Sequence, residues 1–333
     1  MSPTALTTAS YLRIDPGATA QAVESVIREI VLGKLRRKGA VIGISGGIDS
    51  SVVAALCVHA LGSNRVLGVL MPERECSDES RRLGNILAEF LGIRTVLEDI
   101  TPVLEAAGCY RRRDDSIRKL VPEFSAGYKC KLVIPGLATG ARYPLPALVI
   151  ASPDGALQKI RLTSEVYLEI VAATNFKQRV RKMLEYHHAD RMQYAVAGTP
   201  NRLEYDQGFF VRNGDGAADF KPIAHLYKSQ VHQLAEYLHL PREIQERPST
   251  TDTFPMPQSQ EEFYFSVPLR TLDLCLYGKN HGFSPEKIAE MTGLPIADVI
   301  AVLNSIDAKR KATAYLHHAP LLVEDVPEVA QSR

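Results

Sequence analysis

Apolar runs and helical periodicities alternate along the first hundred residues. Three apolar runs predict short buried strands: residues 40–44, 65–70 and 94–98. Apolar positions at helical spacing predict helices before, between and after them: residues 18–38, 48–60, 77–91 and 101–107. This alternation predicts an α/β fold, a Rossmann-like, doubly wound parallel sheet with helices on both faces. The carboxyl ends of such strands meet at one edge, where these folds bind ligands.

The alternation breaks between residues 108 and 163, which we interpret as an insertion in the sheet domain. Its second half contains two β-like runs joined by a turn, residues 145–151 and 157–162. Its first half carries three consecutive arginines at 111–113. They could bind a phosphate or a partner, but a solvated charged segment, partly balanced by Asp114 and Asp115, is favoured.

The pattern then resumes with a long helix at 165–186 that carries Asn175, Lys177, Arg179 and Arg181. Its basic residues either face water or form part of an anion site, and both interpretations stay open. The rest of the chain predicts a fourth strand, one helix and a C-terminal helical group: residues 193–198, 226–238, 269–277, 285–292 and 296–306. We expect an arm at 1–17, one domain at 18–320 and a tail at 321–333.

The segment after the first apolar run carries the clearest chemistry. Residues 45–51 read Ser-Gly-Gly-Ile-Asp-Ser-Ser and lead into a helix. Two glycines let the backbone turn tightly, and the N–H groups of the loop and helix can then bind a phosphate. A Walker A loop would need a lysine before its Ser or Thr, and the dinucleotide fingerprint needs another glycine spacing. A glycine-rich turn without a ligand is the less favoured alternative.

Two later features also predict ligand chemistry. The glycine-rich turn at 208–219 presents Asp215 and Asp219, which could hold Mg²⁺ or a substrate hydroxyl, or simply form an Asp-Gly turn. Lys228 opens a helix, where a cation is unfavourable to the helix dipole. A ligand role for Lys228 is therefore favoured over a structural one.

Composition excludes several classes of protein. The 333 residues are 45% apolar and 23% charged, and the net charge of +1 gives no sign of a nucleic-acid surface. No run of about 18 apolar residues predicts a membrane span, and the first residues do not resemble a secretory signal. Five dispersed cysteines suit reduced thiols. We therefore expect a cytoplasmic protein.

Taken together, the motifs resemble the ammonia-dependent NAD⁺ synthases, within the N-type ATP pyrophosphatases of the adenine nucleotide alpha-hydrolase-like superfamily. The resemblance extends from about residue 20 to 318, without the insertion, and its motifs occur in the family's order. They are the segments at 43–50, 175–181, 198–204, 208–219, 226–228 and 309–310.

The resemblance implies an enzyme that adenylates the nicotinate carboxylate of deamido-NAD⁺ with ATP and Mg²⁺, releases pyrophosphate and lets ammonia form the amide. It implies Asp49 and Glu204 as metal ligands and Asp49 and Lys228 as catalytic residues. It implies an ATP site made of Gly43, Ile44, Ser45, Gly46, Gly47, Ile48, Asp49, Ser50, Thr199, Lys228 and Ser249. It implies a site for the dinucleotide acid made of Arg179, Arg212, Asp219 and Lys309.

The chain departs from the family at four places, all expected near the acid substrate. Val211-Arg212 replaces the usual Thr-Lys, and Thr250-Thr251 alters the loop at 248–252. The stretch at 263–268 also differs, and the insertion is longer than usual. Two alternatives are therefore kept: a related ligase acting on another carboxylate, and a nucleotide-binding module without turnover. Intact Asp49, Glu204 and Lys228 argue against the module.

The resemblance also implies a homodimer, to which Val171, Val180 and Leu184 of the long helix could contribute, although core packing explains them equally well. Only about 40 residues precede the phosphate loop, fewer than a glutaminase domain needs. We therefore expect free ammonia as the nitrogen source, unless a separate glutaminase supplies it.

Overall fold

A four-stranded parallel sheet organises the N-terminal two thirds of the chain. The structure is a computed structural model that describes residues 10–134, 146–251 and 253–328. The sheet has the order β3-β2-β1-β7, formed by Arg94–Leu97, Val66–Leu70, Ala40–Gly43 and Ala195–Val196. The parallel α/β architecture predicted from the sequence is confirmed. The fourth strand is shorter than predicted: Gln193 is the C-cap of the preceding helix (Ser164–Met192), and after Val196 the pairing continues as an isolated bridge between Ala197 and Phe220.

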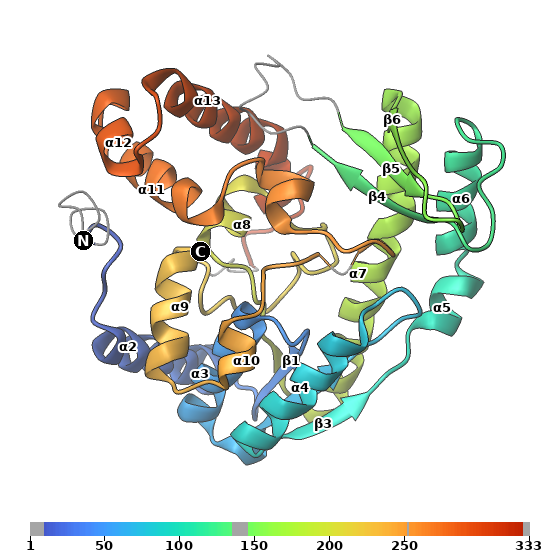
Figure 1. Ribbon diagram of the computed structural model, residues 1–333. Coiled ribbons are helices and arrows are strands. Elements are labelled where there is room, and N and C mark those ends of the chain that lie inside the picture. Colours follow the sequence, from blue (N-terminus) through green and yellow to red (C-terminus); the bar gives the residue numbers. More distant parts are fainter. Residues whose placement is uncertain (1–9, 135–145, 252, 329–333) are drawn as a thin grey trace.

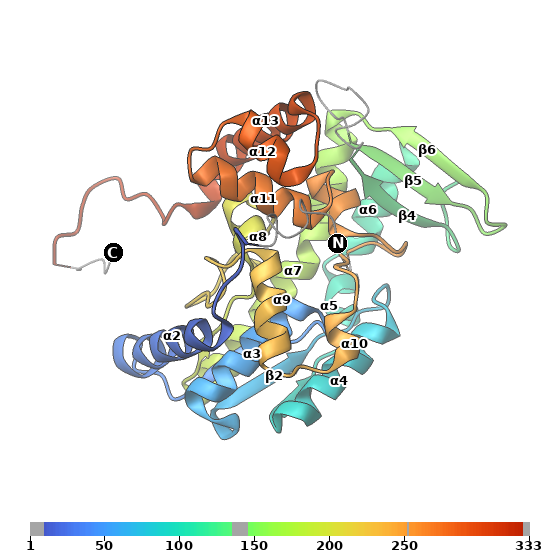
Figure 2. The same cartoon turned by 60° about the vertical axis from the view of Figure 1, so that its left-hand side comes forward.

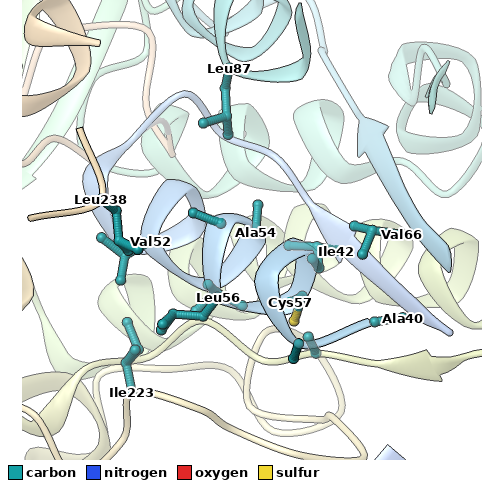
Figure 3. Packing of buried hydrophobic residues seen from close by; sticks show 14 of the residues in the cluster. Ala40, Ile42, Val52, Ala54, Leu56, Cys57, Val66, Leu87, Ile223 and Leu238 are labelled. Atoms are coloured by element: carbon teal, nitrogen blue, oxygen red, sulfur yellow. The ribbon is translucent and has the colours of Figure 1, made fainter. Parts of the chain in front are cut away.

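Two cores cover the two faces of this sheet. Ala40 and Ile42 of β1 face helices α2 (Pro16–Arg28), α3 (Ile48–Leu61), α4 (Asp78–Leu91) and α9 (Lys228–Tyr237). Figure 3 shows Ile42 beside Val66, in the same cluster as Val52, Leu56 and Leu87. Val41 between them faces α5 (Thr101–Ala106), α6 (Cys109–Arg118) and α7 (Ser164–Met192). Helices on both faces bury β1 and β2, so these strands are apolar throughout.

A smaller antiparallel sheet lies beside α6 and α7 (Figure 1). Its strands are β4 (Lys129–Val133), β5 (Ala147–Ala151) and β6 (Leu157–Arg161). The predicted pair, β5 and β6, is confirmed, whereas β4 and α6 were not predicted. The predicted solvated arginine triplet is wrong for Arg113, which is 4% exposed and forms an ion pair with Glu75 at 2.7 Å. Arg111 and Arg112 are exposed as expected.

The C-terminal part forms a helical group with its own core. It contains α11 (Leu269–Asn280), α12 (Pro285–Thr292) and α13 (Ile296–Thr313), which pack on each other and lie away from α2, α3 and α4 in both views (Figures 1 and 2). The three predicted helices are confirmed. Helix α13 continues further than predicted, so the basic residues at 309–311 lie inside it rather than after it.

Short helices complete the described chain: η1 (Glu29–Lys34), η2 (Ser63–Arg65), α8 (Arg202–Gln207), α10 (Arg242–Gln245), η4 (Glu261–Phe265) and η5 (Ala314–His317). Among the described residues, no single helix is long and apolar enough to cross a membrane. Helix α12 and the helical stretch from Ile296 to His317 together have the length and composition of a span, but they are bent by 107° relative to each other. Residues 1–9 of the predicted arm, 135–145 of the predicted insertion and 329–333 of the predicted tail lie outside the described residues.

Candidate active site

A cavity of about 630 Å³ opens at the carboxyl ends of β1 and β2. Its lining comes from the glycine-rich loop, the segment after β2, one face of α7, the turn after α8, Lys228, and the segment at 247–253. This volume lies in the range typical of small-molecule sites. All eleven residues predicted for ATP line it except Gly46, whose neighbours on both sides do.

The loop has the geometry expected of a phosphate site. Gly46 has φ +72°, and a Cβ there would lie 2.7 Å from the carbonyl oxygen of Ser80, so only glycine fits without strain. The Ser45 hydroxyl accepts a hydrogen bond from Gly47 N at 3.2 Å and lies 3.1 Å from Ser50 Oγ. Within the described structure, no side chain caps the start of α3. The N–H groups of this first turn can therefore bind an anion.

Asp49, Lys228 and Glu204 converge on this loop from three elements. The Lys228 ammonium donates a short hydrogen bond to the Asp49 carboxylate. Asn201 connects Asp49 with Glu204: its side-chain amide donates to Asp49 Oδ1 at 3.1 Å, and its backbone N–H donates to Glu204 Oε2 at 3.1 Å. The predicted meeting of Asp49 and Glu204 therefore has a geometric basis in these contacts with Asn201.

Electrostatics in this cluster favour a further cation. Burial, with the nearby Asp49 charge, raises the pKa of Glu204 to about 8. Burial alone would lower the pKa of Lys228, but the carboxylates of Asp49 and Glu204 outweigh it and raise that pKa. While Glu204 holds its proton, the Asp49 carboxylate and the Lys228 ammonium balance each other. A cation that displaces this proton would meet two carboxylates beside the phosphate loop.

Helix α9, which carries Lys228, is anchored by a residue of the C-terminal helices. Asp273 of α11 is fully buried and accepts hydrogen bonds from Lys228 N at 3.2 Å and Ser229 N at 2.7 Å. The hydroxyl of Ser229 donates a third hydrogen bond at 2.5 Å. Burial raises the pKa of Asp273 to about 6. The C-terminal helices therefore hold the position from which Lys228 reaches Asp49.

The four residues predicted for the acid substrate divide into two pairs. Arg179 and Arg212 line the cavity, and Arg179 Nε donates to the Arg212 carbonyl at 3.3 Å. Asp219 and Lys309 are not among the lining residues. The Asp219 carboxylate accepts from Val196 N at 2.7 Å. Burial lowers the pKa of Lys309 to about 8, and its ammonium lies 4.8 Å from the centre of the Tyr264 ring.

Lys177 of the basic helix fits neither of the two open interpretations. Lys177 is 1% exposed and bonds Glu73 at 2.9 Å, Glu75 at 2.7 Å and the Thr253 carbonyl at 2.8 Å. It is a structural residue that ties two cavity-lining segments to α7. Arg179 is exposed and lines the cavity, and within the described residues neither it nor Arg212 forms an ion pair with an acidic side chain. An anion site at these arginines stays a prediction.

Sequence reasoning missed four residues of the site. The first is Asn201, which forms a capping box with the predicted Glu204 at the start of α8, and the N-x-x-E pattern could have indicated it. Gln260, Asp273 and Arg247 had no local signal. Gln260 Nε2 donates to Glu204 Oε1 at 2.9 Å. Arg247 connects the Ser45 carbonyl, at 3.0 Å, with Ser80 Oγ, at 2.7 Å.

Fold and site together define an α/β protein of the nucleotide-binding class, with a glycine-rich loop after its first strand and two arginines, Arg179 and Arg212, in the lining of the same cavity. The family model for NAD synthase matches residues 19–122 and 148–314. The NH(3)-dependent NAD(+) synthetase of Mesorhizobium japonicum is 54% identical to the chain, over 95% of the chain and 99% of that protein. The NH(3)-dependent NAD(+) synthetase of Rhizobium meliloti is 53% identical, over 96% of each. The chain belongs to the NAD synthase family, as the motifs predicted.

Solved structures support the fold independently. The NMN synthetase from Francisella tularensis superposes with a TM-score of 0.64 at 22% identity, covering 93% of this chain and 99% of that one. The NH3-dependent NAD synthetase from Campylobacter jejuni, in complex with the nitrate ion, superposes with a TM-score of 0.61 at 21% identity. The superposition covers 94% of this chain and 100% of that one. At these identities the likeness concerns the fold alone.

Proposed function

We propose that this protein is an ammonia-dependent NAD⁺ synthase. It uses ATP to adenylate the nicotinate carboxylate of deamido-NAD⁺ and releases pyrophosphate. Ammonia then attacks the carbonyl carbon of the mixed anhydride, the bond from that carbon to the phosphate oxygen breaks, and the amide forms with release of AMP and a proton. One observation carries the proposal: a single cavity joins a phosphate loop with Lys228 to two arginines, Arg179 and Arg212, that form no ion pair within the described residues. ATP and an acidic second substrate can therefore meet there.

The residues suit the charge changes of this reaction. Negative charge builds on the phosphate oxygens as pyrophosphate leaves, and N–H groups of the loop together with the Lys228 ammonium can stabilise it. The arginines hold the acid so that its carboxylate oxygen faces the α-phosphate. Ammonia is itself the nucleophile, so the reaction needs no nucleophilic side chain.

We propose Asp49 and Glu204 as ligands of Mg²⁺. Among the described residues, no group of three or more His, Cys, Asp or Glu side chains is arranged for a metal. Two carboxylates fit Mg²⁺ nevertheless, since this ion usually takes its other ligands from phosphates and water. Burial and the Asp49 charge raise the pKa of Glu204 to about 8, so a metal ion bound between the two carboxylates would displace the Glu204 proton. When bound, the ion neutralises phosphate charge.

For the acid half, we propose that Arg179 and Arg212 bind the carboxylate or phosphates of deamido-NAD⁺. Asp219 and Lys309 remain proposed substrate residues, although both lie outside the cavity lining. Because Arg212 replaces the family's lysine, its planar guanidinium can bind an anion at two points.

We further propose that the protein is a homodimer. Val180 is buried, and Val171 and Leu184 pack against core residues, so an interface on α7 would need other side chains. Leu168 and Met183 of α7 are 63% and 54% exposed and are available for it. Light scattering at micromolar concentration tests this, and a monomer would contradict it.

A ligase acting on another carboxylate is the second candidate. The replacement of Thr-Lys by Val211-Arg212 in the cavity wall favours it, since loss of a hydroxyl partner can shift preference between acids by orders of magnitude. A nucleotide-binding module without turnover is disfavoured, because a binder has no need for Asp49, Glu204 and Lys228 beside the phosphate loop.

One assay separates these functions. Pyrophosphate release and amide formation are measured with MgATP and ammonia across a panel of acids: deamido-NAD⁺, nicotinate mononucleotide, nicotinate and aspartate. We expect deamido-NAD⁺ to give the highest kcat/KM and glutamine not to replace ammonia. Pyrophosphate release with another acid but none with deamido-NAD⁺ would support the second candidate. No release with any acid would support the binding module, and equal activity with glutamine would contradict the nitrogen source.

A further inference from the structure

The wall of the cavity beside Arg212 is built by the chain that follows the last long helix. Tyr315 and Leu316 line the cavity, and both belong to the short turn η5. The match to the family model ends at residue 314, just before them. Tyr315 and Leu316 therefore lie just outside the residues that the family model matches.

Contacts on both sides hold this turn in place. Thr313 lies so close to Gly208 that a Cβ at Gly208 would approach Thr313 Cβ to 2.2 Å, and Gly208 also has φ +70°. The His317 ring packs edge-on against Tyr205 at 4.7 Å and Phe210 at 5.4 Å between ring centres. The backbone of Tyr315, between these two anchors, is thus held in place by its neighbours.

Tyr315 and Arg212 form one surface. Arg212 Nη1 donates to the Tyr315 carbonyl at 3.4 Å, and the guanidinium carbon lies 5.8 Å from the centre of the Tyr315 ring. Tyr315 is 56% exposed although it lines the cavity, so much of its ring is uncovered. An uncovered aromatic ring beside an arginine that has no acidic partner in the described chain is suited to a planar ring that carries a carboxylate.

We propose that Tyr315 is a specificity residue for the acid substrate. Its carbonyl orients the Arg212 guanidinium toward the carboxylate, and its ring stacks on the heteroaromatic ring to which that carboxylate is attached. The proposal rests on the proposed function, because it assumes an aromatic acid in this half of the cavity. It assigns no role to Tyr315 in binding ATP.

Steady-state kinetics of three variants test the role of the ring. Tyr315→Ala removes the ring but keeps the carbonyl bonded to Arg212, and Tyr315→Phe keeps the ring. Tyr237 is 46% exposed and lies outside the cavity lining, so Tyr237→Ala is a matched control. We expect Tyr315→Ala to raise the KM for the acid by roughly tenfold, with the KM for ATP changed less than about twofold. Tyr315→Phe and Tyr237→Ala should stay near wild type.

A binding measurement gives a readout that does not need turnover. The chain has no tryptophan, so Tyr315→Trp introduces a single indole at this wall. We expect its emission to change saturably with deamido-NAD⁺ and to change little with MgATP alone. Thermal unfolding of each variant shows that the fold is intact.

The outcomes separate this proposal from the proposed function. If the wild type forms the amide but Tyr315→Ala leaves the KM for the acid unchanged, or the indole responds to MgATP and not to the acid, the role of Tyr315 is wrong and the function stands. If the wild type forms no amide while the indole still responds to deamido-NAD⁺, the proposed function is wrong and the binding wall stands. If neither amide nor response is observed, both are wrong.

Discussion

The ammonium of Lys228 pairs with the carboxylate of Asp49 although 179 positions separate them in the chain. Asp49 stands in the first turn of α3 and Lys228 in the first turn of α9, so the pair joins the starts of two helices that pack on the same face of the sheet. An exposed ion pair contributes little to stability, but this lysine is only 4% exposed. The pair therefore fixes a cation beside the phosphate loop.

Replacing Asp49 by Asn should abolish most pyrophosphate release while the fold remains. Asn keeps the shape of the side chain but removes the charge that the metal and Lys228 need, so we expect kcat to fall by at least about 100-fold. Asp115→Asn, at a surface ion pair, is the control. Pyrophosphate assays and circular dichroism measure both effects. Near-normal turnover would exclude Asp49 from the proposed role.

Stability without ligand should depend on pH through Glu204. The folded chain holds a proton on Glu204 up to about pH 8, whereas the unfolded chain releases it above the ordinary pKa of 4.5. The folded state thus binds more protons between these values, and the free energy of unfolding falls as the pH rises through this window. Metal binding displaces the same proton, so the affinity for MgATP should rise over the same window.

Thermal unfolding from pH 5 to 8.5, compared between wild type and Glu204→Gln, measures this contribution. The amide keeps one acceptor and cannot titrate, so the variant should lose part of the pH slope. Parallel curves for the two proteins would show that Glu204 does not titrate in this range.

Lys177 should be far more important for stability than an exposed lysine. Lys177→Met leaves Glu73, which is buried, and Glu75 without their shared cation, and we expect a loss of about 3–5 kcal/mol. Lys119 also contacts two glutamates, Glu165 and Glu169, but at the surface, where solvent screens the pairs, so Lys119→Met should cost far less than Lys177→Met. Urea unfolding of both variants gives the comparison. Equal losses would contradict a structural role for the buried network.

Asp273 should affect catalysis without touching the substrates. In Asp273→Asn, one oxygen acceptor at the start of α9 is replaced by an amide donor, and we expect a loss of about 1–3 kcal/mol with a lower kcat, because Lys228 is displaced. Asp307→Asn is the control. Asp307 of α13 forms a surface ion pair with Lys279 of α11, the helix that also carries Asp273. Its loss should change neither the stability nor kcat much. A stability loss with unchanged kcat would mean that Asp273 does not position Lys228.

Local patterns predicted the parts of the site that depend on neighbouring residues. The loop at 45–51 and the strands before and after it could be recognised because glycine spacing and apolar runs are short-range signals. Lys177 was ambiguous, since its partners Glu73 and Glu75 lie about a hundred positions away. Asp273 and Gln260 gave no signal for the same reason. The short strand β4 was missed because its partner, β5, lies beyond an intervening segment.

Arg212 should serve the acid substrate and not ATP. Its guanidinium lies on the cavity wall with Arg179 and Tyr315, and no acidic partner in the described chain neutralises it. Arg212→Ala removes a charged hydrogen-bond donor for an anion, so we expect the KM for deamido-NAD⁺ to rise by about 10- to 100-fold. Arg212→Lys keeps the charge but loses two-point binding, so its KM for deamido-NAD⁺ should lie between those of the wild type and Arg212→Ala. Steady-state kinetics with each substrate varied in turn measure the difference. A defect confined to the KM for ATP would assign Arg212 to the phosphate site and overturn this division of the cavity.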